Sequence, residues 1–223
     1  MPYTQSVTVG PRPDERADEA DADAAQIEAG SSHAFDLGAE LEARGDLSGA
    51  EAAYRRADEH GDAAAAFCLG QLLERRGDLE AAEAAYHRAD DRGHAAAASD
   101  YGALLGERGD LLGAEAAFRR ADGRGDAVGA VNLGLLLEQH GDLAGAEAAY
   151  ARADERGDAS AASDYGVLIA ERGDLVGAEA AFRRADARGD AVGAYNLGLL
   201  LEQQGDLPGA QAAYRRADER RRR

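Results

Sequence analysis

The chain has 223 residues, and its 43 acidic residues outnumber its 25 basic ones, which gives a formal charge of −18. Apart from five histidines every basic residue is arginine, and the chain has one cysteine, one methionine and no tryptophan. The single cysteine excludes an intramolecular disulfide framework and fits a reducing compartment, and the acidic balance disfavours non-specific binding to nucleic acid or to anionic membranes.

Residues 1–31 differ from the rest of the chain. Residues 11–32 read PRPDERADEADADAAQIEAGSS, which is acidic and poor in apolar side chains. Such a composition cannot bury enough surface to offset the entropy of ordering, so we expect a flexible or weakly helical leader. The N-terminus lacks the basic start and apolar core of a secretory signal, and no apolar run reaches the length of about 20 residues that spans a bilayer. We therefore expect a cytoplasmic protein without a membrane partner.

One stretch of 32 residues recurs from residue 32 to residue 223. Its clearest copy, GDLVGAEAAFRRADARGDAVGAYNLGLLLEQQ, covers residues 173–204. Closely similar copies start at Gly45, Gly77, Gly109 and Gly141, and another copy begins at Gly205. Repetition at a fixed spacing is the signature of a repeat protein, in which each unit buries its apolar face against its neighbours.

Each repeat predicts two helices. In the second copy the first helix should run over about residues 63–76, and the second should end near residue 92. Gly77 can adopt the left-handed conformation that closes a helix, and the Asp78 side chain can cap the next helix. A glycine followed by aspartate recurs at the other junctions, except at Gly93-His94. Helices therefore alternate every sixteen residues, about twelve in all.

The periodic positions predict the packing. A leucine opens every second helix, and an aromatic residue follows it seven positions later. A glycine recurs inside every first helix, where it costs about 1 kcal/mol relative to alanine. We expect these leucines and aromatics to pack, and the glycines to mark close contacts where a side chain would collide. The positions are Leu47, Leu79, Leu111, Leu143, Leu175 and Leu207; Tyr54, Tyr86, Phe118, Tyr150, Phe182 and Tyr214; and Gly38, Gly70, Gly102, Gly134, Gly166 and Gly198.

These positions resemble the tetratricopeptide repeat. In the second copy the matching residues are Ala66, Leu69, Gly70, Leu73, Ala82, Tyr86 and Ala89. The period is 32 where that family has 34, and residues 153–162, ADERGDASAA, look like the junction of the related Sel-one-like repeats. The resemblance implies an all-α solenoid of about six helix-turn-helix repeats, with antiparallel helices in a right-handed superhelix and the first helices on its concave face.

A longer period lies above the first. Residues 99–156 and 163–220 differ at only 10 of 58 positions, so the copies alternate in type. Recent duplication of a 64-residue pair explains this alternation, and a groove chemistry shared by alternate repeats is compatible with it.

The concave face that the resemblance implies would be apolar and acidic, with amides in it. Asn132 and Asn196 occupy the position where the family often binds a peptide backbone, although either could merely hydrogen-bond a neighbouring helix. The carboxylates could pair with a partner's cations or simply be solvated. The candidate partner-binding residues are Asn132, Asn196, Asp100, Asp164, Glu107, Glu171, Val131, Tyr195, Glu138 and Glu202.

The sequence therefore predicts a non-enzymatic scaffold that binds a protein or peptide of basic or mixed charge. No residue set suggests catalysis, a cofactor or a metal, and Cys68 is expected to be a small buried thiol. Two alternatives remain. The protein could associate with itself through uncapped ends, as a homo-oligomer, or it could be an acidic decoy that occupies the nucleic-acid site of a basic protein.

Overall fold

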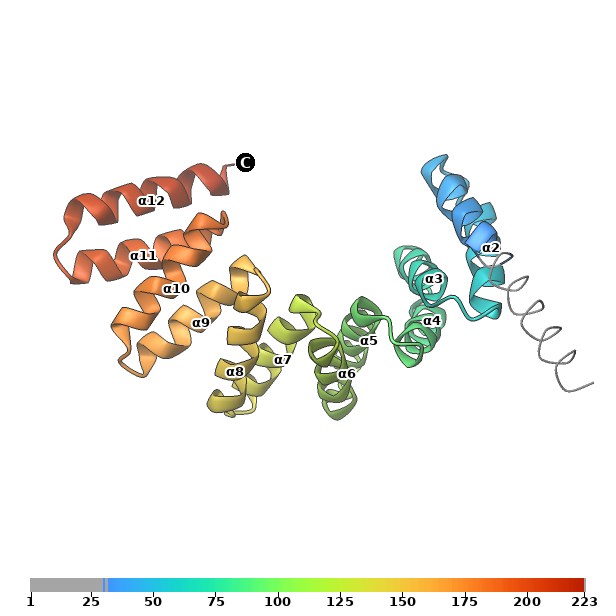
Figure 1. The fold of residues 1–223 in the computed structure, drawn as a ribbon, viewed down its shortest axis with the longest axis horizontal. Helices are drawn as coiled ribbons and strands as arrows, with labels where there is room; N and C mark the ends of the chain where they lie inside the picture. Colours follow the sequence, from blue (N-terminus) through green and yellow to red (C-terminus); the bar gives the residue numbers. More distant parts are fainter. Residues whose placement is uncertain (1–29, 31, 223) are drawn as a thin grey trace, which may run out of the picture. The chain divides into compact units, whose positions relative to one another are not determined.

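The computed structural model describes residue 30 and residues 32–222, so the expected leader lies, apart from residue 30, outside the described residues. Within them the chain is all-α (Figure 1). One helix covers residues 32–43. The others are α2 (Leu47–Glu59), α3 (Ala63–Arg75), α4 (Leu79–Asp91), α5 (Ala95–Glu107), α6 (Leu111–Gly123), α7 (Ala127–Gln139), α8 (Leu143–Glu155), α9 (Ala159–Glu171), α10 (Leu175–Ala187), α11 (Ala191–Gln203) and α12 (Leu207–Arg221).

The chain divides into two compact units, residues 1–85 and residues 86–223. In the second unit α5 packs on α6, α7 on α8, α9 on α10 and α11 on α12, and each pair packs on the next along the chain. The odd-numbered helices are the first helices of the predicted repeats, and the even-numbered ones are the second helices. The helical repeat architecture is thus confirmed.

The helix ends follow the local sequence as predicted. The junction glycines from Gly45 to Gly205 have φ between 80° and 96°, the left-handed region that glycine adopts without a steric penalty. At the following position an aspartate accepts from a backbone amide, as where the Gly145 N–H donates to Asp142 Oδ1 at 2.9 Å. At the one exception His94 takes over this role, because its Nδ1 accepts from the Ala97 N–H at 3.2 Å. Every junction therefore keeps a cap.

The predicted contacts between glycine and aromatic side chains are present. Tyr150 is fully buried, and a Cβ added at Gly134 would lie 2.5 Å from its Cε1. Gly38, Gly102, Gly166 and Gly198 face Tyr54, Phe118, Phe182 and Tyr214 in the same way. A ring lies where the helix has no side chain, which draws the two helices of a repeat together.

The leucines that open the second helices are not core residues, contrary to the prediction. They are 42% to 56% exposed, from Leu47 and Leu111 up to Leu207. Each is the first residue of its helix, beside the turn, so it lies on the correct face but beyond the end of the partner helix. Burial begins one turn later, at Ala50, Ala114 and their equivalents.

Second helices are joined by buried ion pairs. In the unit of residues 86–223, one aspartate near the end of each second helix binds two arginines from the next second helix. Asp122 accepts from Arg152 Nε at 2.9 Å and Nη2 at 2.6 Å, and from Arg156 Nη1 at 2.6 Å. We call this set the arginine–aspartate ladder. Its other members are Asp90 with Arg120 and Arg124, Asp154 with Arg184 and Arg188, and Asp186 with Arg216 and Arg220.

The ladder keeps its carboxylates charged. Burial by itself would raise the pKa of Asp122, but the hydrogen bonds and charges of Arg152 and Arg156 outweigh it and hold the pKa below 3.8. The same balance lowers the pKa of Asp90, Asp154 and Asp186. Because these pKa values are lower than in the unfolded chain, the ladder stabilises the fold above about pH 4 and loses this effect as the pH falls through the folded pKa.

The close glycine contact predicts a specific cost for one methyl group. Gly134→Ala should destabilise the chain by about 1–3 kcal/mol, because overpacking against Tyr150 outweighs the better helix propensity of alanine. Gly123→Ala, with no other atom within 4 Å of the new Cβ, is the matched control and should be neutral or stabilising by up to about 1 kcal/mol. Urea unfolding followed by circular dichroism measures both, and equal effects would contradict the packing argument.

The ladder predicts an asymmetry between its two sides. Changing Arg152 and Arg156 to alanine leaves a buried carboxylate unpaired and should cost about 3–5 kcal/mol at pH 7. Asp122→Ala should cost less, because the arginine side chains are 41% and 26% exposed and can be solvated by water. Urea unfolding at pH 7 tests this order, and the difference should shrink below pH 4 as Asp122 is protonated. A larger cost for Asp122→Ala would contradict it.

Candidate functional site: the first-helix face

The first helices of residues 86–223 form one surface. α5 contacts α7, and α9 contacts α11, while the ladder joins the second helices. Leu135, Val167 and Leu199 occupy equivalent positions on α7, α9 and α11 and are 42%, 39% and 40% exposed. Ala103 is their equivalent on α5, and it is also exposed. We call this surface, with its polar neighbours, the first-helix face.

The first-helix face contains a hollow of about 510 Å³ between α9, α10 and α11. Its walls are mainly apolar, and two amides and a carboxylate lie on its rim. The lining residues are Val167, Ala170, Glu171, Leu175, Phe182, Asn196, Leu199, Leu200 and Gln203.

An exchange of two residues opens this hollow. In α8 the Tyr150 hydroxyl donates to Glu138 Oε2 at 2.8 Å, and the glutamate lies twelve residues before the tyrosine. Tyr214 with Glu202, and Tyr54 with Glu42, form the same pair. In the alternate repeat the two positions hold Phe182 and Ala170, so neither a hydroxyl nor a carboxylate fills the space.

The same exchange occurs 64 residues earlier, where Gly106 precedes Phe118. The longer period of the sequence thus has a structural meaning, because it alternates a filled contact of tyrosine with glutamate and an unfilled contact of phenylalanine with a small residue. This agrees with a groove chemistry shared by alternate repeats.

The two candidate asparagines differ in their surroundings. Asn132 Nδ2 lies 3.5 Å from Ser99 Oγ, which is a long hydrogen bond to the neighbouring helix. Asn196 lies on the rim of the hollow. The equivalent serine, Ser163, is buried, and its Oγ has no hydrogen-bond partner among the described residues. Asn196 thus has its amide at the hollow, whereas Asn132 contacts its neighbour.

The candidate carboxylates also fall into groups. Glu171 is exposed on the rim of the hollow, and Glu107 is exposed at the end of α5. Asp100 and Asp164 are half-buried on α5 and α9. Glu138 and Glu202 accept from the tyrosine hydroxyls, so they stabilise the repeats as well as facing solvent. The bond from Tyr214 to Glu202, together with burial, raises the pKa of Tyr214 to about 12.

Asp164 is surrounded by other negative charges. Burial raises its pKa to about 6, and the carboxylates of Glu138, Asp190 and Asp158 contribute in the same direction. All three of these charges are acidic, so this part of the first-helix face has a negative potential that favours a bound cation.

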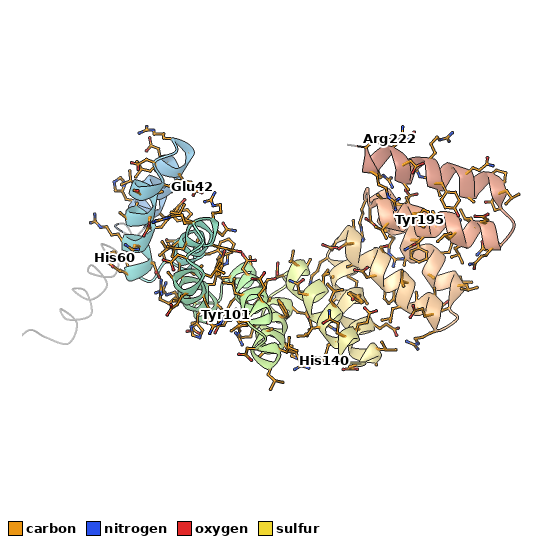
Figure 2. The ribbon with its side chains drawn as sticks, turned by 180° about the vertical axis from the view of Figure 1, so that it is seen from behind. Glu42, His60, Tyr101, His140, Tyr195 and Arg222 are labelled. Atoms are coloured by element: carbon orange, nitrogen blue, oxygen red, sulfur yellow. The ribbon has the colours of Figure 1, made fainter. Side chains whose placement is uncertain are left out.

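The two remaining candidates have different positions. Val131 is half-buried and packs against the core between α7 and its neighbours. Tyr195 is 40% exposed on α11, and Figure 2 shows it on the helix next to the end of α12, where Arg222 is labelled. Of the predicted set, Glu171 and Asn196 meet at the hollow, whereas Val131 belongs to the core.

Sequence reasoning missed four residues that form the hollow, Val167, Ala170, Leu175 and Phe182. A signal for two of them was present, because every tyrosine at the aromatic position follows a glutamate by twelve residues, whereas each phenylalanine follows a glycine or an alanine. The ladder also had a signal, since arginines recur 30 and 34 residues after each of its aspartates.

Other kinds of site find little support in the described part of the chain. Residues 32–222 contain no group of three or more histidine, cysteine, aspartate or glutamate side chains that could hold a metal ion. Cys68 is half-buried rather than buried, and burial raises the pKa of its thiol, which disfavours the reactive thiolate. In the same residues no helix has the length and apolar content needed to cross a bilayer.

The comparisons with known proteins agree with this architecture. The tetratricopeptide repeat family model matches residues 193–223. No protein of curated function matches the chain in sequence. Among solved structures the chain is similar to c5321 of uropathogenic Escherichia coli, a protective antigen with an SLR fold, with a TM-score of 0.72 and 22% identity. This match covers 84% of the chain but only 45% of c5321, so the chain spans less than half of that protein.

Two further structures are similar. A Sel1 repeat protein from Oxalobacter formigenes has a TM-score of 0.72 and 22% identity, and the match covers 86% of the chain and 87% of that protein. YrrB, a tetratricopeptide repeat protein with an unusual peptide-binding site, has a TM-score of 0.53 and 23% identity, with 75% and 91% covered. The chain is therefore a helical repeat protein of the tetratricopeptide and Sel1-like kind. That fold is generally a scaffold for protein interactions and is typically not an enzyme.

The acidic surroundings of Asp164 predict an unusual pH dependence. Its folded pKa lies above that of the unfolded chain, so the stability that this residue contributes falls as the pH rises from about 4 to about 6. Asp164→Asn should remove this fall and stabilise the chain at pH 7 by about 1 kcal/mol, since one pKa unit is worth 1.36 kcal/mol and partial exposure screens part of it. Carbon-13 NMR of the carboxyl group measures the pKa directly. A midpoint near 4 would contradict the prediction.

Proposed function

We propose that the first-helix face of residues 86–223 binds a peptide segment of a partner protein, and that the hollow between α9, α10 and α11 receives one of its apolar side chains. The observation that supports this most is the unfilled contact at Phe182 and Ala170. The hollow has a volume within the range of ligand sites, and few polar groups converge on its rim, as in sites that orient a ligand.

The polar groups on the rim suit a peptide backbone. The Asn196 side chain offers both a donor and an acceptor, which matches the alternating amide and carbonyl groups of an extended segment. Gln203 provides a second amide on the same rim. Val167 and Leu199 supply apolar contact area beside them.

The charge distribution favours a partner of basic or mixed charge. Eight arginines of this unit bind the ladder aspartates on the second helices, so their charge is largely neutralised there. Glu171 and Asp164 lie on the first helices, and no arginine contributes to the pKa of Asp164. A lysine or arginine of the partner would therefore meet carboxylates beside the hollow.

Self-association through the chain ends is less well supported. A second copy that continued the repeat would place His33 where Ala161 or Gly193 stands in other first helices. That position is tight, because a Cβ on Gly193 would lie 2.3 Å from the Ala185 Cβ. An imidazole does not fit such a contact. The acidic decoy is weakened by the ladder, which distributes arginines along the second helices. We therefore favour a non-enzymatic peptide-binding scaffold, which we place in the cytoplasm because its single thiol is free.

The hollow can be closed with the chain's own residues. Ala170→Glu combined with Phe182→Tyr recreates the pair that Glu138 and Tyr150 form. We expect this variant to fold with unchanged helicity and to lose at least about tenfold in affinity for peptides, because losing one large buried side chain is worth about 1.5–3 kcal/mol. The added carboxylate would strengthen a basic ligand's attraction, so a loss reports the closed hollow.

A random twelve-residue peptide library selected on the immobilised chain supplies the ligands, and calorimetry measures their affinities. Val131→Ala is the control, since Val131 packs in the core and away from the hollow. Asn132→Ala with Asn196→Ala should also weaken binding while leaving helicity intact. Selected peptides that bind the closed variant as well as the wild type, or a selection that enriches no peptide, would overturn the proposal.

A further inference from the structure

An arginine of the last helix lies over a candidate binding residue. The Arg221 Cζ is 5.4 Å from the centroid of the Tyr195 ring, within the range of a cation–π interaction. Tyr195 is on α11 and is 40% exposed, so its ring is accessible from solvent at the first-helix face. Arg221 is the final residue of α12, one turn from the end of the described chain.

The ring of Tyr195 belongs to the same surface as the hollow. Leu199 follows Tyr195 by one helical turn and lines the hollow, and Glu202 follows by two turns, so the three residues share one side of α11. The Tyr214 ring lies 5.5 Å from that of Tyr195, and its hydroxyl donates to Glu202 Oε2 at 2.7 Å. Two aromatic rings and a carboxylate therefore lie together beside the hollow.

This combination suits a guanidinium group. The face of a tyrosine ring attracts a cation, and arginine stacks on it more often than lysine does. The equivalent positions on α5, α7 and α9 hold Ser99, Val131 and Ser163, which have no aromatic face. Among the first helices of this unit only α11 offers the contact.

We propose that Tyr195 is an arginine-binding position of the peptide site, and that Arg221 is an internal occupant which the ligand's guanidinium displaces. The inference rests on the proposed function, because it extends the same surface by one anchor. It assigns the ligand an arginine next to the apolar residue that enters the hollow. It also makes the end of α12 a competitor that lowers the affinity of the site for cationic ligands.

The site can be probed without knowing the partner. The full chain is labelled with carbon-13 in its tyrosine rings, the Tyr195 signal is assigned with Tyr195→Leu, and argininamide is titrated. We expect argininamide to shift the Tyr195 signal, and Arg221→Gln to lower the midpoint by about two- to fivefold, the factor that an exposed cation–π contact is worth. Arg215→Gln removes an exposed arginine of the same helix that is not over Tyr195, and should leave the midpoint unchanged.

Citrullinamide is the ligand control, since it keeps the shape and loses the charge, and it should not shift the signal. The inference is overturned if argininamide leaves Tyr195 unshifted, or if the midpoint of Arg221→Gln equals that of the wild type. Ala170→Glu with Phe182→Tyr should leave the argininamide titration intact. Failure of peptide binding at the hollow is thereby separated from failure of the arginine position.

Discussion

The arrangement of the repeats depends on how each buried aspartate meets the next second helix. A carboxylate such as that of Asp154 has a side-chain exposure of 6%, and its charge is tolerated because Arg184 binds it through two nitrogens and Arg188 through a third. The planar arginine fork fits this geometry, which lysine cannot reproduce. Because the donors lie 30 and 34 residues after the acceptor, each bridge ties one repeat to the next and fixes the distance between second helices.

The ladder also divides the charge of the molecule. Arginines are engaged on the second helices, whereas Asp164 and Glu171 lie on the first helices without an arginine partner among the described residues. Alternate repeats differ again, because the pair of tyrosine and glutamate fills the space that phenylalanine and alanine leave open at Phe182. The surface suited to a peptide thus results from two repeated patterns, one of charge and one of volume.

The sequence was sufficient for the fold because its signals are local. A glycine at positive φ, the following aspartate cap, and Gly134 facing Tyr150 each follow from residue type and spacing. Leu111 was misplaced because periodicity gives the face of a helix but not the point at which its partner helix ends. Asn196 and Glu171 were correctly grouped, but the hollow depends on the volumes of two side chains twelve residues apart. Only the packed structure shows that Ala170 and Phe182 leave that space open.

The central claim is that a partner binds over the hollow, and site-specific photocrosslinking tests it most directly. A benzophenone amino acid is placed at Leu199 in one protein and at Leu112, an 81% exposed residue at the start of α6, in another. After irradiation in cell extract, mass spectrometry should find a partner segment with an arginine and an apolar residue attached at position 199, absent at position 112 and lost when the hollow is closed. Crosslinks at position 199 that survive closing the hollow, or that join only copies of this chain, would contradict the account.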